Sequence, residues 1–279
     1  STRSADDTWE QPWGERRLVR NHYSELRVGL KESNNLNRAL EVVFRVYDDG
    51  VGFRYEFPDQ PALKAVNIGD ELTEFTLASP ATAWWIPAGE WNRYEYLYRK
   101  TPLAEVGPAH TPMTVRTDDG VYIAFHEAAL VDYSAMWLRH VEGPKFRASL
   151  SPSSGGAKVR RVAPFNTPWR TMQIADSAGG LYMSDLILNL NEPNKLGDVS
   201  WFTPFKYIGV WWAMHLDTET WATGARHGAT TENTKRDIDF AAANSCGGVL
   251  AERRKAGCDA EWLAARAGRI LAEAGRGEV

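Results

Sequence analysis

The chain is organised around one stretch, Tyr207-Ile208-Gly209-Val210-Trp211-Trp212-Ala213-Met214, whose almost uninterrupted apolar character is typical of a strand buried on both faces. Thr230 and Thr231 follow as good helix N-caps, and apolar residues then recur at helical spacing as far as Ala242. Gly247-Gly248 interrupts this helix before a second apolar run, Val249-Leu250. The pattern predicts a strand, a helix and a strand in succession, which is the βαβ unit of a parallel sheet.

The residues before this stretch follow a different pattern, because apolar and polar residues alternate with the period of antiparallel strands. The turn sequences Asp48-Asp49-Gly50 and Asp118-Asp119-Gly120 each separate two such runs and predict two hairpins. We predict a third hairpin, with a strand through Met172, a turn from Asp176 to Gly180 and a returning strand from Leu181 to Leu190. Many antiparallel strands at short spacing predict a large sandwich of two packed sheets.

The composition limits the classes of partner. A net charge of -4 gives no reason to expect nucleic acid or an anionic membrane surface as a partner. No apolar run approaches the roughly 20 residues that span a bilayer. The 12 Trp residues are unusual, since flat indole faces stack well on sugar rings, although indoles also fill cores and interfaces.

The change of pattern divides the chain into three parts. We predict a β-domain of residues 1–199, a βαβ unit of residues 200–252 and a helical, Ala- and Arg-rich tail of residues 253–279. A (β/α)8 barrel needs eight βα units and roughly 200 or more residues. The second part is therefore expected to be an incomplete barrel fragment.

Three residues of this fragment are candidates for binding a substrate. His215 is predicted to end the first barrel strand, at the rim where barrel enzymes place their substrate-binding loops. His227 lies just before the predicted helix, and Trp212 offers an indole face. Structural histidines and a packing tryptophan are the alternatives.

We assign no catalytic residue. Asp217 and Glu219 follow the first predicted barrel strand, but they are expected to be surface carboxylates of a loop. No His/Cys cluster supports zinc, no Gly-rich loop suits a phosphate, and no Gly-x-Ser-x-Gly sequence suggests a serine hydrolase.

Over about residues 9 to 252, the chain resembles the N-terminal part of glycoside hydrolase family 97, the bacterial α-glucosidase and α-galactosidase family. The segments that carry the resemblance are Trp84-Trp85-Ile86-Pro87-Ala88, Thr111-Pro112-Met113-Thr114, His126-Glu127-Ala128-Ala129-Leu130, Asn166-Thr167-Pro168-Trp169-Arg170, Leu188-Asn189-Leu190-Asn191-Glu192-Pro193, Lys206-Tyr207-Ile208-Gly209-Val210-Trp211-Trp212 and His227-Gly228-Ala229-Thr230-Thr231-Glu232-Asn233-Thr234-Lys235. The resemblance implies a mainly β fold, in which a large antiparallel β-super-sandwich is followed here by an incomplete (β/α)8-barrel fragment. It ends at Arg253-Arg254-Lys255, where the family has a segment that lines the sugar pocket.

The resemblance also bears on Glu192, which follows a predicted aliphatic strand. A hard cation such as calcium takes six to eight oxygen ligands, and a loop glutamate supplies some of them. Spacing alone favours an ordinary turn carboxylate at this position. The family, however, implies a calcium ion held by glutamates of both domains, with Glu192 as one ligand in the complete enzyme and weak or absent binding in this chain.

The expected function is that of a truncated α-glycosidase, inactive alone because the two carboxyl groups that hydrolysis requires would lie outside this chain. A non-catalytic sugar-binding β-sandwich and a structural or assembly module are the alternatives. The expected ligand is an oligosaccharide or α-glycoside, and self-association through the incomplete barrel is an expected second contact. We expect a periplasmic or secreted bacterial protein whose leader has been removed.

Overall fold

The computed structural model describes residues 1–33, 35–90 and 94–251. The chain forms two compact units, and the second begins at Pro204. The domain limits predicted after residues 199 and 252 stay predictions. The predicted helical tail of residues 253–279 lies outside the described residues. None of the described helices is long and apolar enough to cross a membrane.

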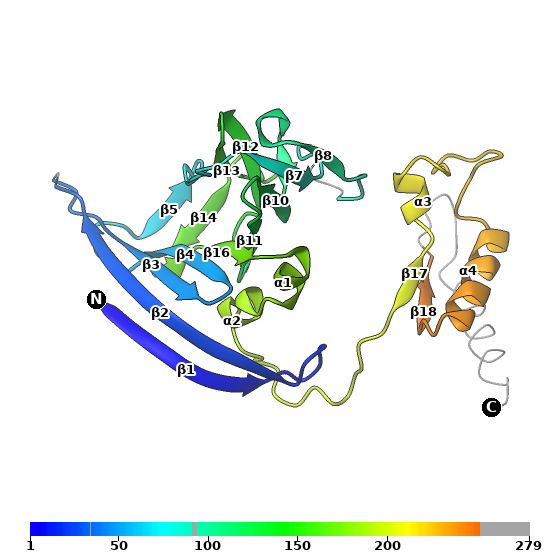
Figure 1. The fold of residues 1–279 in the computed structure, drawn as a ribbon, viewed down its shortest axis with the longest axis horizontal. Coiled ribbons are helices and arrows are strands. Elements are labelled where there is room, and N and C mark those ends of the chain that lie inside the picture. The colour runs from blue at the N-terminus through cyan, green and yellow to red at the C-terminus, as the bar shows by residue number, and fades with distance from the viewer. Residues whose placement is uncertain (34, 91–93, 252–279) are drawn as a thin grey trace. The chain divides into compact units, whose positions relative to one another are not determined.

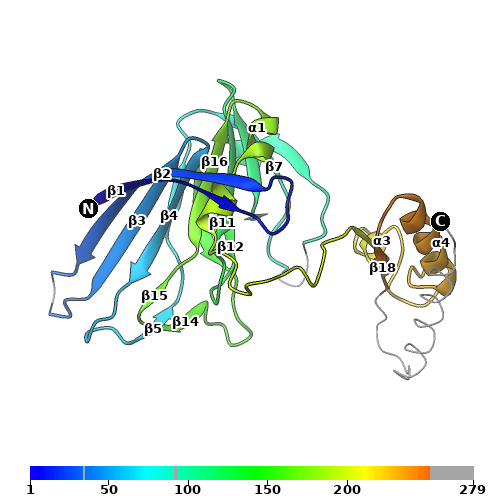
Figure 2. The ribbon, with the colours of Figure 1, turned by 90° about the horizontal axis from the view of Figure 1, so that it is seen from below.

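A large antiparallel sheet is the frame of the first unit, and Figure 2 shows several of its strands side by side. In spatial order its strands are β1 (Thr2–Glu10), β2 (Leu18–Lys31), β3 (Ala39–Tyr47), β4 (Gly50–Phe57), β16 (Trp169–Ala175), β11 (Tyr122–Ala128), β10 (Met113–Thr117), β7 (Ala81–Trp85) and β8 (Arg99–Pro102), with β15 (Phe165–Asn166) also paired to β4.

A smaller antiparallel sheet packs on one face of the large one. Its strands, in spatial order, are β6 (Glu74–Thr76), β13 (Lys145–Leu150), β12 (Met136–Glu142) and β9 (Ala109–His110). Between the two sheets lies a core that includes Trp85, Met113 and Phe125 from the large sheet and Leu138 and Phe146 from the small one. The predicted antiparallel sandwich is therefore confirmed. A separate pair, β5 (Ala65–Ile68) and β14 (Val159–Val162), and a short 3₁₀ helix, η1 (Leu103–Glu105), complete the β-part of this unit.

Two of the three predicted hairpins are confirmed. β3 pairs with β4 around Asp48-Asp49-Gly50, and β10 pairs with β11 around Asp118-Asp119-Gly120. Gly50 has a φ of 149°, and a Cβ there would lie 2.2 Å from the carbonyl oxygen of Met172. The first turn therefore needs glycine both for its backbone angle and for the close approach of β16.

The third predicted hairpin is wrong, because the strand expected from Leu181 to Leu190 is two short helices, α1 (Ala178–Met183) and α2 (Leu186–Leu190). Leu186 and Leu190 are four residues apart and nearly fully buried, so they share the face that packs on β4, β16 and β11 (Figure 1). A short apolar run can form either a buried strand or a helix with one buried face. The sequence from Leu181 to Leu190 did not distinguish these two structures.

The second unit contains the predicted strand, helix and strand. β17 (Tyr207–Gly209) and β18 (Gly248–Leu250) are parallel neighbours, and α4 (Thr231–Ala243) connects them (Figure 1). The Thr230 hydroxyl accepts a hydrogen bond from the backbone N–H of Asn233, so Thr230 is the N-cap and Thr231, the other candidate, is the first residue of the helix. The predicted order of strand, helix and parallel strand is therefore confirmed. Two strands are too few to show whether they belong to a barrel, so the barrel fragment stays a prediction.

The first strand of this unit is shorter than predicted. It ends at Gly209, and the rest of the apolar run turns into a one-turn helix, α3 (Trp212–His215). Within this helix Met214 is 1% exposed and Trp212 is 50% exposed, so the run is buried on one side rather than on the two faces of a strand. His215 therefore ends a helix, which corrects its predicted place at the end of a strand.

Candidate functional site

The three predicted substrate-binding residues lie in the connection between β17 and α4. Trp212 begins α3, His215 ends it, and His227 precedes the N-cap of α4. Because β17 and β18 are parallel, their carboxyl ends lie at the same end of the sheet. This connection leaves β17 at that end (Figure 1). Parallel α/β folds bind their ligands at the carboxyl ends of the strands.

His215 is part of a small aromatic cluster. Its ring lies edge-on to Trp221, with centroids 5.1 Å apart, and edge-on to Trp211 at 5.4 Å. Trp212 touches this cluster through Trp211, with ring centroids 5.7 Å apart, and is 50% exposed. The cluster thus combines a half-exposed indole with a histidine whose ring is fixed by packing, and both features suit contact with a sugar.

His227 is held by the same connection. Its backbone forms an isolated parallel bridge with Thr220, and its Nδ1 lies 3.2 Å from the Thr220 carbonyl oxygen. The ring contacts of His215 are with Trp211 and Trp221 and not with His227, so the structure brings the two histidines to one loop rather than into one contact.

The two carboxylates near this loop do not form a pair. Asp217 is exposed at a left-handed φ of 60°. Glu219 is bound to the side chain of Asn233 at 3.2 Å and lies 3.8 Å from the Arg236 guanidinium. Asp217 is thus an exposed loop carboxylate, as predicted, whereas the side chain of Glu219 is only 25% exposed and is bound to α4.

Glu192 follows the helix α2, which corrects its predicted place after a strand. Its side chain is 57% exposed and lies 3.7 Å from the ammonium group of Lys195. The neighbouring Asn191 amide is already used, because it donates to the Ile187 carbonyl and accepts from the Ala129 N–H. Among the described residues there is no group of three or more carboxylate, His or Cys side chains that fits a metal ion. Glu192 is thus a single exposed carboxylate that belongs to no such group among these residues.

The sequence did not lead us to predict a buried cluster of ion pairs in the first unit. Arg170, which is 0% exposed, donates to both carboxylate oxygens of Glu71 at 2.8 and 2.6 Å and to Glu127 at 2.6 Å. Glu127 also accepts the N–H of Met136, and burial raises its pKa despite the nearby guanidinium. The sequence feature that could have predicted this cluster is a charged residue at a position of a strand where an apolar residue is expected. Arg170 and Glu127 are two such residues.

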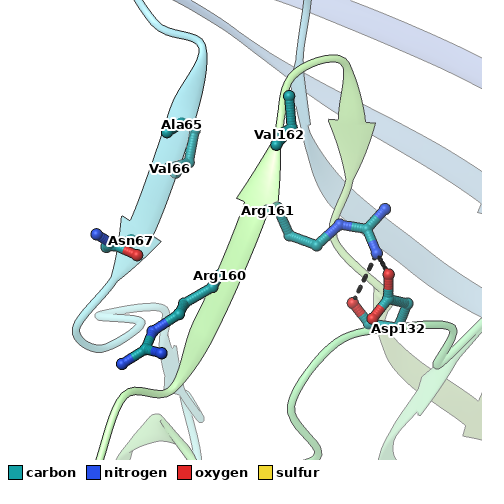
Figure 3. Close-up of a pocket in the computed structure, with 7 residues that line it drawn as sticks. All are labelled: Ala65, Val66, Asn67, Asp132, Arg160, Arg161 and Val162. Atoms are coloured by element: carbon teal, nitrogen blue, oxygen red, sulfur yellow. Dashed lines mark hydrogen bonds and ion pairs between the residues drawn. The ribbon is translucent and has the colours of Figure 1, made fainter.

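The first unit also has an open depression between β5 and β14. It is lined by Ala65, Val66, Asn67, Asp132, Arg160, Arg161 and Val162 (Figure 3). The guanidinium of Arg161 is paired with the carboxylate of Asp132 and also donates to its carbonyl oxygen. With this charge neutralised, the depression offers no convergent set of polar groups for a ligand.

Comparison with known families accounts for both units. A family model described as the N-terminal part of glycosyl hydrolase 97 matches residues 1–193, which is more than half of the chain. The chain belongs to glycoside hydrolase family 97. A second model, for glycoside hydrolase 97 itself, matches residues 211–273 and so includes Trp212, His215 and His227.

Individual relatives agree with this assignment to family 97. A family 97 enzyme from Pseudoalteromonas sp. strain K8, solved in complex with acarbose, has 51% identity and a TM-score of 0.77 over 94% of this chain and 40% of its own. The same enzyme was solved as a variant with panose. A retaining alpha-galactosidase of Bacteroides thetaiotaomicron is 26% identical over 88% of this chain and 40% of its own length. The chain thus spans about two fifths of the length of these relatives.

Proposed function

We propose that the chain serves an α-glycosidase, as a segment that holds the sugar while α-glucosidic or α-galactosidic bonds are hydrolysed. The observation that carries this proposal is the 51% identity to a family 97 enzyme whose structure was solved with acarbose. Trp212, His215 and His227 all lie within the part of the chain that this family describes.

The chemistry assigns these residues to binding. An indole face stacks on the apolar C–H face of a sugar ring, and imidazole nitrogens exchange hydrogen bonds with hydroxyl groups. Cleavage itself needs two carboxyl groups, about 5–5.5 Å apart for retention or about 6.5–9.5 Å for inversion. Since Asp217 and Glu219 do not make such a pair, the chain alone is expected to bind sugar without cleaving it.

We further propose that Glu192 supplies one carboxylate to a calcium ion whose other ligands come from outside the described residues. Its exposure and its weak pairing to Lys195 support this role. Because one carboxylate meets only a small part of the six to eight ligands that calcium takes, the isolated chain should bind the ion weakly. A calcium titration of the chain and of its Glu192→Gln variant tests this, and equal affinity of the two would contradict it.

The sugar-binding role is tested by NMR. Acarbose, panose and galactose are titrated into the labelled chain, and we expect acarbose or panose to shift the signals of Trp212, His215 and His227 with a Kd of about 1 mM or weaker. Release of p-nitrophenol from the α-glucoside and the α-galactoside is followed in parallel, with and without calcium, and should stay at background. Unchanged signals at all three residues would overturn the proposed role.

We also propose that the protein acts in the periplasm or outside a bacterial cell, where oligosaccharides are met before uptake. Detection of the full-length protein in the periplasmic or culture fraction tests this, and its recovery in the cytoplasm would contradict it.

A further inference from the structure

Asn233 lies in the first turn of α4 and joins the helix to the preceding loop. Its side-chain amide donates to the Gly228 carbonyl oxygen at 3.0 Å and to a carboxylate oxygen of Glu219 at 3.2 Å. Its backbone N–H is bound by the Thr230 hydroxyl at 3.1 Å. Both amide hydrogens are thus used on two loop residues, while the backbone is fixed by the helix cap.

The loop that Asn233 holds is closely packed at Gly228. A Cβ added there would lie 2.3 Å from the Glu219 carboxylate and 2.8 Å from the Met214 side chain. The N–H of Gly228 donates to the Thr220 carbonyl at 3.2 Å. Both the N–H and the carbonyl group of Gly228 are therefore hydrogen-bonded, which fixes the backbone directly after His227.

The position of His227 then selects its tautomer. Its Nδ1 lies 3.2 Å from the Thr220 carbonyl oxygen, which only accepts hydrogen bonds, so Nδ1 carries the proton. In a neutral imidazole the other nitrogen, Nε2, is then an acceptor. Among the described residues no hydrogen bond to this Nε2 is found. A sugar hydroxyl is a donor that suits it.

We propose that Asn233 is a positioning residue for substrate binding: with Glu219 and Gly228 it holds His227 as the Nδ1–H tautomer, so that Nε2 accepts a hydrogen bond from a substrate hydroxyl. The acceptor role rests on the proposed sugar-binding function, whereas the tautomer and its dependence on Asn233 do not.

The test is made on the whole chain, labelled with ¹⁵N at histidine and studied at a pH of about 8, above the usual imidazole pKa of about 6.5. The His227 signals are assigned by their loss in His227→Gln. Asn233→Asp keeps the size of the side chain and places a carboxylate near the helix N-terminus, which the helix tolerates, but it loses both donated hydrogen bonds. Asn244→Asp is the matched control, because the Asn244 amide donates only within the other end of α4, to the Phe240 carbonyl.

In the unsubstituted chain and in Asn244→Asp we expect a protonated Nδ1 and an unprotonated Nε2 at His227. In Asn233→Asp we expect the averaged signals of a ring that samples both tautomers. Gly228→Ala, which displaces the loop by steric contact, should give the same averaging. A protonated Nε2 in the unsubstituted chain, or unchanged signals in both Asn233→Asp and Gly228→Ala, would overturn the proposal.

Acarbose then separates the positioning claim from the sugar-binding claim. Because only a fraction of the rings is then the Nδ1–H tautomer, acarbose binding should weaken by about two- to fivefold in Asn233→Asp and stay unchanged in Asn244→Asp. Equal affinities would overturn the role of Asn233 in binding. If the unsubstituted chain shows the expected tautomer but no acarbose binding, the sugar-binding function fails and the positioning of His227 stands.

Discussion

At the scale of single residues, Arg170 shows how a charge is kept inside the sandwich. The guanidinium has no exposed surface, and its donors are aimed at two carboxylates, Glu71 and Glu127. A fourth group joins the cluster, since the Thr73 hydroxyl donates to Glu71. Burying these charges is costly, so the cluster fixes the arrangement of its strands more than it adds stability.

Replacing Arg170 with Met should destabilise the first unit by about 3–5 kcal/mol near pH 7, because two buried carboxylates lose their cation. Carboxylates without a cation have raised pKa values and bind protons in the folded state, so the loss should shrink as the pH falls towards about 5. Urea unfolding at both pH values measures this. The exposed Arg160→Met is the control, and a pH-independent loss in Arg170→Met would contradict the account.

Glu56 gives the opposite pH response. Burial favours its neutral form, but hydrogen bonds from Arg27 and Arg54 outweigh this and lower its pKa. A lowered pKa means that the stabilisation is present above the unfolded value of about 4.5 and is lost as the pH falls through the folded value. We therefore expect Glu56→Gln to flatten the loss of thermal stability below pH 4.5, compared with the exposed Glu142→Gln. Parallel acid profiles of the two variants would refute this.

At the scale of elements, α2 depends on a residue far away in the chain. One carboxylate oxygen of Asp49, in the β3–β4 turn, accepts the N–H groups of Asp185 and Leu186 at 2.7 and 3.0 Å. It also accepts the hydroxyl of Ser184 at 2.7 Å. This carboxylate takes the place of an N-cap, because the residue at the N-cap position makes no side-chain cap of its own.

Asp49→Ala should therefore cost about 1–2 kcal/mol, the range of a lost helix cap, and should loosen α2 before the sandwich. Asp48→Ala is the matched control, since Asp48 is the neighbouring residue, is 88% exposed and makes one long contact with His22. Hydrogen exchange of the α2 amides together with urea unfolding distinguishes the two. Equal exchange in both variants would show that Asp49 does not hold the helix.

At the scale of the whole molecule, the second unit leaves apolar side chains in solvent. Phe205, Tyr207, Trp212 and Phe240 are each at least half exposed. Within the described residues, β17 and β18 pair only with each other, so each has an open edge. Open strand edges beside exposed apolar side chains favour association.

We predict that the chain self-associates, with a sedimentation coefficient that rises with protein concentration. Tyr207→Lys, which places a charge on the edge strand β17, should weaken this association. Leu196→Lys is the control, because Leu196 is 73% exposed and lies in the first unit. A concentration-independent monomer, or equal weakening by both variants, would be the contrary result.

Local patterns were sufficient for part of this molecule. The two Asp-Asp-Gly hairpins, a helix cap at Thr230 or Thr231 and the order of β17, α4 and β18 follow from interactions within a few residues, which a sequence displays directly. The family resemblance was carried by short segments of the same kind, and the family models confirm it.

Tertiary structure decided the rest. Leu186 to Leu190 became a helix because Asp49, 137 residues before Leu186, binds its first N–H groups. Arg170 found Glu71 across 99 residues, and Asn233 reached back to Glu219 and Gly228 to fix His227. A hydrophobic pattern states which residues avoid water, but a hydrogen bond or ion pair between distant residues exists only once the fold brings its donor and acceptor together.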